Sequence, residues 1–436
     1  MKKYFGTDGI RGVANVELTP QMAYKTGQAI GYLLLKKDNP YVYVGKDSRI
    51  SSPLLEYSLI SGLLSMGVNV KRLHLIPSPC VAYLTGSTES DYGIMVSASH
   101  NPYYDNGIKV FNHEGKKITD DEEDFIESFI DGEVDYIKPT HEHVGVVLNR
   151  HESMYQYIES LYFSVTTRFT GLKVGLDCAN GSTSNIANRL FARLGAEVTV
   201  INDKPNGTNI NDQCGSTYPE RLQQLVKTKG LDIGFAFDGD GDRVIAVDDQ
   251  GELFDGDQII ALLAKHAKTE CRGVVATVMS NGALIDTLKE QGIDTYLTKV
   301  GDKYVYEEMV KRDLMVGGEQ AGHIILREFN TSGDGMLTAL QVASALQAAG
   351  QALSKLRFTP YPQVSEKVQV SDKKRIIQDA GLLELKSKLE ASDSSARIVL
   401  RASGTEPLIR VMVEQPKESV CESMTNQLLE KIRSLQ

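Results

Sequence analysis

Apolar positions along the chain gather in short runs, and three of these runs lead into a glycine-containing turn and an amphipathic stretch. They lie at residues 41–44, 173–176 and 273–278, and each is followed by apolar residues at helical spacing. In the second and third units a further apolar run follows, at residues 197–201 and 295–297. This repeated strand–helix pattern predicts three related α/β domains with mixed sheets flanked by helices.

The first helix is predicted to begin at Thr19-Pro20. Threonine is a favoured N-cap, and proline is favoured at the first helical position. Apolar or small residues then recur at intervals of four, three and four, at Ala23, Gly27, Ile30 and Leu34. This spacing places them on one helix face, which we expect to be buried.

The end of the chain has a different pattern. A strand is predicted at 364–370, a helix at 373–391, and two further strands at 397–400 and 408–413. A closing helix has one apolar face, formed by Val420, Met424, Leu428, Ile432 and Leu435. This order predicts an α+β domain.

A linker is predicted before this last domain, at Pro360 and Pro362. The chain then divides into three α/β domains and a C-terminal α+β domain. The predicted boundaries are 1–149, 150–250, 251–362 and 363–436.

The net charge of the chain restricts the kinds of partner that it can bind. Lys and Arg number 47 and Asp and Glu 57, so the formal net charge is −10. A general nucleic-acid binder or a membrane-surface protein would need a basic surface, so we expect neither kind of partner. An anionic ligand would need positive groups that are concentrated locally.

The cysteines and the apolar runs indicate the compartment. The five cysteines are too far apart for a zinc-finger or redox motif, and their odd number does not indicate a disulfide framework. The N-terminus, MKKYFGTDGIRG, has no apolar stretch of signal-peptide length. The longest apolar run, 259–264, is too short to cross a bilayer. We therefore expect a cytoplasmic protein with free thiols.

An acidic loop with the sequence DGDGDR, residues 238–243, separates two apolar runs. Its three aspartates can converge on one hard cation because the glycines allow a tight turn, and without a cation they would repel each other. An EF-hand is disfavoured because Arg243 and Asp249 stand where that motif needs Gly and Glu. The pattern predicts a Mg²⁺ site, and an Asp/Gly hairpin turn is the alternative.

Two further loops carry polar groups at the ends of apolar runs. SASHNP, residues 97–102, follows the strand-like run 93–96 and is followed by Lys109, although a hydrogen-bonded turn serine would also explain it. A serine hydrolase is disfavoured because no G-x-S-x-G sequence surrounds the serine. GGEQAGH offers Glu319 and His323, which suit a sugar, but a loop with a satisfied histidine is the simpler explanation.

RASGTEP, residues 401–407, combines hydroxyls, a glycine turn and an arginine, and Arg410 follows. Guanidinium groups and a nest of backbone N–H groups suit a phosphate dianion. The alternative is a helix capping box formed by Ser403 and Glu406. The apolar, β-favouring run 409–413 disfavours a helix and supports phosphate binding.

Two clusters of charged residues have simpler explanations than a site. The acidic run 120–124 is expected at a helix start, where the helix dipole favours a solvated acidic face. His141-Glu142-His143 could be half of a metal site, but no companion ligands lie nearby. We expect this segment to be a surface loop between domains.

In this order, SASHNP, DGDGDR, GEQAGH and RASGTEP resemble the motifs of the α-D-phosphohexomutases, and the resemblance covers most of the chain. Their order and spacing match the four-domain plan of that family. Four stretches are most similar to the bacterial members that act on glucosamine phosphates. These are FGTDGIRG at the start, residues 209–211 ahead of CGST, VGDKYV at 300–305, and GGEQ at 317–320.

The resemblance implies a role for each motif. Ser99 would be the phosphorylated residue, and one Mg²⁺ per chain would be bound by Ser99, Asp238, Asp240 and Asp242. Lys109 and His100 would serve in acid–base work and charge stabilisation, with Arg11 as the active-site arginine of the first domain. Glu319 and His323 would face the sugar. The non-reacting phosphate would be held by Arg401, Ser403, Gly404, Thr405 and Arg410.

The resemblance also implies the reaction. Ser99 would pass its phosphoryl group to O1 of glucosamine 6-phosphate, and the resulting hexose 1,6-bisphosphate, both intermediate and activator, would turn end for end. Its other phosphate would return to Ser99 and release glucosamine 1-phosphate, for UDP-N-acetylglucosamine and cell-wall precursor synthesis. A C-terminal domain that opens and closes would permit the turn.

Two positions depart from the family pattern. Ala321 stands where serine is usual, and Ala402 stands where proline is common. The expected partner is a small sugar phosphate, and whether the chain forms a homodimer stays open.

Two alternatives also stay open. One is a phosphoglucomutase or phosphomannomutase of the same family, and the other is a non-catalytic metal- and sugar-phosphate-binding protein. Contacts that separate the sugars are expected in 209–217, 300–305 and 319–323.

Overall fold

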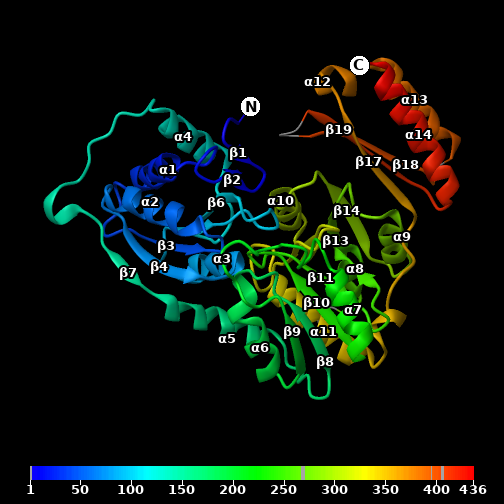
Figure 1. Cartoon of the computed structure of the whole chain (residues 1–436), viewed down its shortest axis with the longest axis horizontal. Helices are drawn as coiled ribbons and strands as arrows, with labels where there is room; N and C mark the ends of the chain where they lie inside the picture. Colours follow the sequence, from blue (N-terminus) through cyan, green and yellow to red (C-terminus); the bar gives the residue numbers. More distant parts are fainter. Residues whose placement is uncertain (1, 267–270, 394, 404–406) are drawn as a thin grey trace.

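A computed structural model describes residues 2–266, 271–393, 395–403 and 407–436. Within this part of the chain the strands form three mixed sheets flanked by helices and one antiparallel sheet near the C-terminus. Figure 1 shows the C-terminal unit, in orange and red, standing to one side of the other three. The predicted fold class, three related α/β domains and a C-terminal α+β domain, is confirmed.

The first sheet has the strand order β1-β2-β6-β5-β3-β4-β7. Its strands are β1 (Phe5–Gly6), β2 (Gly9–Val13), β3 (Tyr41–Lys46), β4 (Asn69–Leu75), β5 (Tyr92–Val96), β6 (Asp105–Asn112) and β7 (Val147–Asn149). Its helices are α1 (Pro20–Leu33), α2 (Ser52–Leu64), α3 (Ser78–Ser87) and α4 (Asp120–Asp131). Helix α1 begins as predicted, because Thr19 caps it by accepting from the N–H of Met22.

The second and third sheets have the orders β12-β11-β10-β8-β9 and β14-β13-β15-β16. The second contains β8 (Lys173–Asp177), β9 (Glu197–Ile201), β10 (Ile233–Phe237), β11 (Val244–Val247) and β12 (Leu253–Phe254), with α5 (Met154–Ser164), α6 (Ala187–Arg193) and α7 (Glu220–Lys229). The third contains β13 (Gly273–Thr277), β14 (Asp294–Thr298), β15 (Val316–Gly318) and β16 (Ile324–Leu326), with α8 (Gly256–Lys265), α9 (Gly282–Glu290), α10 (Asp302–Arg312) and α11 (Gly335–Ala349).

One four-strand unit recurs in these three sheets, as β4-β3-β5-β6, β9-β8-β10-β11 and β14-β13-β15-β16. In each unit the first three strands are parallel and the last is antiparallel to its neighbour. The predicted repeat is therefore confirmed. The turn from the third to the fourth strand lies at equivalent places in the three domains, and it contains SASHNP, DGDGDR and GEQAGH respectively.

The C-terminal sheet has the order β17-β19-β18 and is antiparallel. Its elements are β17 (Gln363–Gln369), α12 (Lys373–Ile377), α13 (Ala380–Ser392), β18 (Arg397–Ala402), β19 (Leu408–Glu414) and α14 (Glu418–Ser434). The prediction of a single helix at 373–391 is wrong. The helix is interrupted before Asp379, which caps α13 by accepting from the N–H of Leu382.

The stretch with helical spacing after the apolar run 173–176 is also interrupted. The stretch from Gly181 to Leu194 starts as a 3₁₀ turn, Ser182–Asn185, and only then becomes α6. Ile186 stands between the two.

The hydrophobic core is divided unequally. One large cluster of buried side chains runs through all three α/β domains and includes Tyr43, Phe235 and Val274. The C-terminal domain has its own cluster, with Ile409 and Leu428 among its members. The first three domains therefore form one packed body, whereas the fourth has a separate core.

A short set of contacts joins the C-terminal domain to the third domain. Glu414 accepts from the N–H of Gly282 at 3.0 Å, and Arg397 donates to the carbonyl of Ser280. Arg397 also lies 3.0 Å from Glu414. These polar contacts join the domain near the N-terminus of α9.

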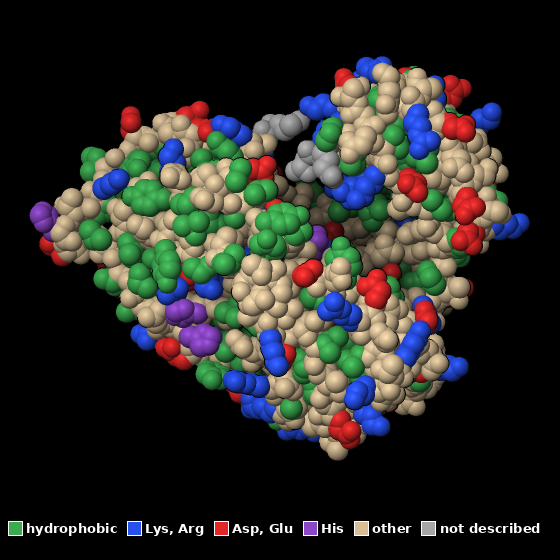
Figure 2. All heavy atoms as spheres, viewed as in Figure 1, with side chains coloured by type: hydrophobic (Ala, Val, Ile, Leu, Met, Phe, Trp, Pro, Cys, Tyr) green, Lys and Arg blue, Asp and Glu red, His purple; other side chains and the backbone are tan. Residues whose placement is uncertain are grey.

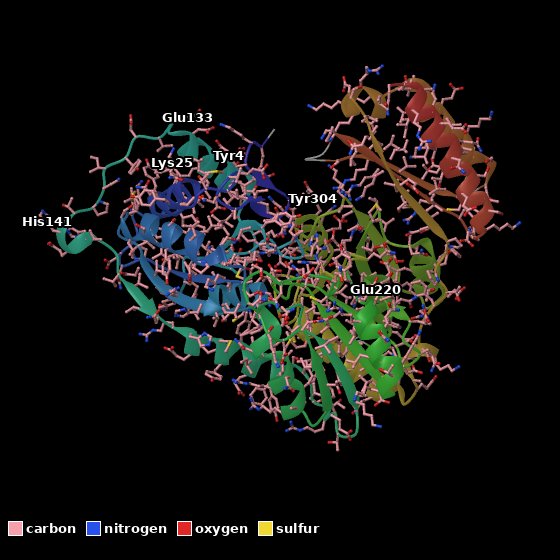
Figure 3. All side chains as sticks on the ribbon, viewed as in Figure 1. Tyr4, Lys25, Glu133, His141, Glu220 and Tyr304 are labelled. Atoms are coloured by element: carbon pink, nitrogen blue, oxygen red, sulfur yellow. The ribbon has the colours of Figure 1, made fainter. Side chains whose placement is uncertain are left out.

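The structure places the two clusters of charged residues for which the sequence favoured simpler explanations than a site. Figure 3 shows His141 at an outer end of the molecule, and this segment forms an exposed 3₁₀ turn, His141–His143. The surface loop expected there is confirmed. The acidic run starts α4 as expected, but Glu123 is buried and pairs with Lys2, so that face is only partly solvated.

All five cysteines are free thiols, as predicted. In the described ranges, no helix is both long enough and apolar enough to cross a membrane.

Replacing Gly62 by alanine should destabilise the first domain. Its Cβ would lie 2.0 Å from the carbonyl oxygen of Tyr24 on α1, so α1 and α2 would have to separate. Overpacking of this kind costs about 1–3 kcal/mol. Thermal unfolding followed by circular dichroism should show a lower Tm. Gly381→Ala is the control, because its closest neighbour is the flexible end of Lys431, and an unchanged Tm for Gly62→Ala would contradict the close packing.

Candidate active site

Side chains from three domains meet at one point. Ser99, in the turn after β5, donates from Oγ to Asp238 at 2.5 Å. Lys109, on β6, lies 2.7 Å from one oxygen of Asp242. His323, in the turn before β16, has Nδ1 3.6 Å from the other oxygen of Asp242. The structure therefore brings together residues that the sequence predicted from the first, second and third domains.

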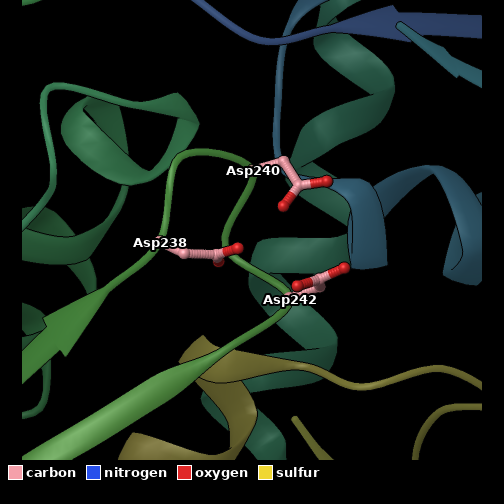
Figure 4. Close-up of side chains that lie close together, drawn as sticks. All are labelled: Asp238, Asp240 and Asp242. Atoms are coloured by element: carbon pink, nitrogen blue, oxygen red, sulfur yellow. The ribbon is translucent and has the colours of Figure 1, made fainter. Parts of the chain in front are cut away.

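The acidic turn between β10 and β11 directs three carboxylates toward one another, as Figure 4 shows. Asp238, Asp240 and Asp242 are buried, and one oxygen atom of each lies within 4.8 Å of the others. Among the described residues, one oxygen of Asp240 and one of Asp242 have no hydrogen-bond partner. A set of hard oxygen donors with unused lone pairs fits a metal ion.

Two carboxyl groups of the acidic turn have pKa values shifted in opposite directions. Burial, together with repulsion from Asp242 and Asp240, raises the pKa of Asp238 well above its usual value. Burial acts in the same direction on Asp242, but Lys109 and His323 outweigh it and hold the pKa of Asp242 well below its usual value. The turn therefore concentrates negative charge that nearby cations must balance.

Lys109 is the closest of these cations. Its Nζ lies 2.7 Å from Asp242, 2.8 Å from Asp240 and 3.0 Å from Asp8, and the residue is 2% exposed. Burial opposes its charge, but Asp240, Asp242 and Asp8 raise the pKa of Lys109 well above its ordinary value. In this arrangement Lys109 is a positive charge rather than a base.

His100 lies beside Ser99, with Nδ1 3.3 Å from Oγ. Burial and the neighbouring cations Arg243 and Arg11 lower the pKa of His100 to about 3. The ring is therefore neutral at physiological pH. It can hydrogen-bond to Ser99 or to a group attached there, but it holds a proton poorly.

The third-domain turn contributes a carboxylate and an imidazole. Glu319 accepts from the N–H of Gly301 at 3.0 Å, so the VGDKYV stretch lies beside it. Burial favours a neutral His323, but Asp242, Asp302 and Glu319 raise the pKa of His323 to about 9. Nε2 of His323 accepts from the N–H of Gly333 at 3.2 Å, which leaves Nδ1, 3.6 Å from Asp242, as the ring nitrogen that carries the proton.

The predicted phosphate-binding sequence RASGTEP falls between β18 and β19 of the C-terminal domain. Arg401 and Arg410 are directly opposite each other in the antiparallel register, and Lys367 of β17 is opposite Arg410 on its other side. All three are exposed on the same sheet face, so one anion over that face could contact all three. Ser403 is buried, and its carbonyl accepts from Lys373 at 2.5 Å. Gly404 and Thr405 lie outside the described residues.

The space-filling view places positive charge at a hollow in the surface. Figure 2 shows the surface hollowed between the C-terminal domain and the other three, with Lys and Arg side chains of that domain along its edge. Such a hollow can admit an anionic molecule between the C-terminal domain and the other three domains.

Sequence reasoning missed two carboxylates. Asp8 contacts Arg11 and lies 2.6 Å from Lys117, as well as touching Lys109. Asp302 lies 2.7 Å from the same Lys117 and 3.5 Å from His323. Both lie within quoted stretches, FGTDGIRG and VGDKYV, but a single acid in a loop has no spacing that identifies it.

The structure also shows where three further positions singled out in the sequence lie. Ala321 is exposed on its turn, and Ala402 ends β18 half-buried. In the segment 209–217, Asn211 is turned toward the first domain, and its side chain donates to the carbonyls of Ser99 and Asn101. The side-chain amide nitrogen of Asn211 is thus used by the Ser99 turn, and sugar contacts from the segment 209–217 stay a prediction.

Comparisons with known proteins cover nearly the whole chain. Residues 2–136, 155–251 and 255–363 match phosphoglucomutase/phosphomannomutase alpha/beta/alpha domains I, II and III, and residues 366–431 match the C-terminal domain of the same proteins. The chain is 47% identical to phosphoglucosamine mutases of Bacillus cereus (strain AH187) and Bacillus anthracis (strain A0248), over 100% of this chain and 99% of each relative.

Solved structures share the fold at lower identity. A phosphoglucomutase/phosphomannomutase family protein of Burkholderia thailandensis has a TM-score of 0.82 at 23% identity, covering 100% of this chain and 98% of that one. N-acetylphosphoglucosamine mutase of Aspergillus fumigatus, solved with GlcNAc-6P and magnesium, has a TM-score of 0.73 at 17% identity, covering 100% and 96%.

The acidic turn should bind a divalent cation. Adding Mg²⁺ should raise the Tm of the wild-type protein, because a ligand that binds only the folded state stabilises it. Asp240→Asn removes one charged ligand and should weaken Mg²⁺ binding by about tenfold or more in isothermal titration calorimetry. Asp212→Asn, an exposed change in the same domain, should bind like wild type. Equal Mg²⁺ affinities for all three proteins would rule the acidic turn out as the metal site.

Proposed function

We propose a specific activity for this chain, which belongs to the phosphoglucomutase/phosphomannomutase family: it interconverts glucosamine 6-phosphate and glucosamine 1-phosphate. The observation that carries the proposal is the 2.5 Å contact between Ser99 Oγ and Asp238. It puts a hydroxyl that can be phosphorylated against the acidic turn. The choice of amino sugar is supported by the relatives named phosphoglucosamine mutase, 47% identical over the whole chain.

Asp238, Asp240, Asp242 and a phosphate on Ser99 would bind one Mg²⁺. When bound, this ion neutralises charge on the transferring phosphoryl group. The structure-based support for this ligand set is the convergence of the three carboxylates and the oxygens of Asp240 and Asp242 that lack a hydrogen-bond partner among the described residues.

Cationic side chains of the protein would stabilise the remaining negative charge of the phosphoryl group. Lys109 is held as an ammonium between Asp240 and Asp242, on the same acidic turn whose Asp238 contacts Ser99, so it would stabilise negative charge at this turn. Arg11, beside Asn101 and Asp8, would bind phosphoryl oxygens from the first domain. Neutral His100 would orient Ser99 Oγ and its phosphate through Nδ1.

The third-domain turn would bind the sugar. Glu319 can accept hydrogen bonds from sugar hydroxyls. Asp302 and Asp242 contact the two ring nitrogens of His323 and fix the ring plane. His323 would thus give the sugar-binding turn a fixed wall beside Asp242.

The C-terminal domain would bind the phosphate that does not react. Arg401, Arg410, Ser403, Gly404 and Thr405 are the proposed ligands, with Lys367 added from the sheet register. A hexose 1,6-bisphosphate, as intermediate and activator, has a phosphate at each end. Each end can therefore occupy this sheet face while the other meets Ser99. A separate core would let the domain move while the intermediate turns.

A coupled assay of sugar phosphates tests the activity. With Mg²⁺ and a trace of hexose 1,6-bisphosphate, glucosamine 6-phosphate should give a higher kcat/KM than glucose 6-phosphate or mannose 6-phosphate. Intact-mass analysis should find one phosphate, mapped to Ser99. Ser99→Ala should lose both the phosphate and the activity, by a factor of about 10³ or more.

The alternatives give different results in the same experiment. A preference for glucose 6-phosphate or mannose 6-phosphate would assign the chain to another activity of the family. Full activity of Ser99→Ala would exclude a phosphoserine enzyme. Binding of sugar phosphate without turnover by wild type would indicate a non-catalytic binding protein.

Lys367 should contribute to phosphate binding. Lys367→Met keeps the aliphatic stem and removes one of the three adjacent charges, so KM should rise about tenfold. The kcat should stay within about twofold, because a uniformly bound group affects substrate and transition state alike. Lys388→Met, an exposed change on α13, is the matched control. A KM for Lys367→Met equal to that of Lys388→Met would remove Lys367 from the site.

A further inference from the structure

The turn that carries Ser99 is strained. Ser99 has a φ of 54°, in the left-handed region that residues with a Cβ rarely adopt. Its Oγ is nevertheless directed at Asp238, and the residue is fully buried. A non-glycine residue stays in such a conformation only where the surroundings hold it there.

Two side chains hold this turn by its carbonyl groups. Arg49 donates to the carbonyls of Ser99 and Asn101 at 2.9 Å each. The side-chain amide of Asn211 donates to the same two carbonyls, at 2.9 and 3.0 Å. Each of these carbonyls thus accepts from a guanidinium on one side and an amide on the other, which fixes the peptide planes around Ser99.

The two donors differ in the domain that carries them. Arg49 belongs to the first domain, like Ser99, and is locked there by a buried ion pair with Asp47 at 2.8 Å. Asn211 belongs to the second domain, where its own N–H donates to the carbonyl of Ala179 at 3.0 Å. That domain also carries Asp238. Asn211 therefore belongs to the same domain as the acidic turn, and its side chain binds the turn of Ser99 in the first domain.

The acidic turn itself approaches the same carbonyl. A Cβ added at Gly239 would lie 2.7 Å from the carbonyl oxygen of Ser99 and 2.9 Å from the amide nitrogen of Asn211. The three segments therefore pack without room for a side chain between them. A shift of the Asn211 loop would change the spacing between Ser99 Oγ and the acidic turn.

We propose that Asn211 is a positioning residue, which keeps Ser99 Oγ in register with the acidic turn across the boundary between the first and second domains. This inference rests on the proposed function, because it assumes that Ser99 accepts and donates the phosphoryl group. Arg49 holds the turn in its conformation, and Asn211 sets the position of the turn relative to Asp238.

The role predicts a particular kinetic effect. Both half-reactions use the same Oγ, so a displaced Ser99 slows phosphoryl transfer to and from the enzyme. The sugar phosphate is bound by the third and C-terminal domains, which Asn211 does not touch in the described contacts, so KM should be little affected. A merely structural role would lower Tm and leave kcat per folded molecule unchanged.

Asn211→Asp is the sharpest test. Aspartate has the same shape and tolerates the left-handed φ of 57° at this position, but it presents oxygen instead of two N–H donors to the carbonyls. We expect kcat to fall about tenfold or more while KM stays within about twofold. Asn188→Asp, an exposed change on α6 of the same domain, adds the same charge and should behave as wild type.

A second variant and a second measurement complete the test. Asn211→Gly removes the side chain and also permits the left-handed backbone, so it should show the same loss of kcat. Incubation of unphosphorylated protein with glucose 1,6-bisphosphate, followed by intact mass, should show slower phosphorylation of Ser99 in both variants than in wild type.

The outcomes separate the two proposals. If folded Asn211→Asp and Asn211→Gly have wild-type kcat and phosphorylation rates, the positioning role is overturned. Loss of folding in both variants would assign the contact to stability and would overturn it equally. If wild type takes up phosphate on Ser99 but interconverts no glucosamine phosphate, the proposed function fails while the phosphorylation rates still test Asn211.

Discussion

Repulsion among three buried carboxylates is the constraint around which the centre of the molecule is arranged. Asp238, Asp240 and Asp242 lie on one short turn, and water is largely excluded from them. Like charges this close cannot all remain ionised unless cations lie nearby. The first domain supplies Lys109 beside Asp242, and the third domain supplies His323. The three α/β domains are thus joined at the site by charge, as they are elsewhere by a shared core.

The recurrent four-strand unit explains how one chain assembles such a site. The turn from the third to the fourth strand occupies the same place in each unit, so three copies can direct three different sets of side chains at one volume. The first copy supplies a hydroxyl and an imidazole, the second carboxylates, and the third a glutamate with a histidine. The division of chemistry among domains therefore follows from one repeated connection.

The sequence predicted the parts of the site that depend on local spacing. Alternate aspartates in a glycine-rich turn, and a hydroxyl at a strand end, can be recognised without knowing the neighbours. Asn211, Asp8 and Lys367 could not be placed in the same way, because their partners lie on other strands, loops or domains. The predicted helix at 373–391 was wrong for a related reason, since only the cap at Asp379 shows where it breaks.

The separate core of the C-terminal domain has a consequence for how the molecule comes apart. Two bodies with their own buried clusters, joined mainly by a linker and a few polar contacts, are two cooperative units rather than one. Heat or a protease could open the smaller unit while the larger stays folded. Ser99 and the acidic turn would keep their mutual geometry, because both belong to the larger unit. If the C-terminal domain binds the non-reacting phosphate as proposed, opening it alone would leave phosphoryl transfer possible and release the intermediate to water.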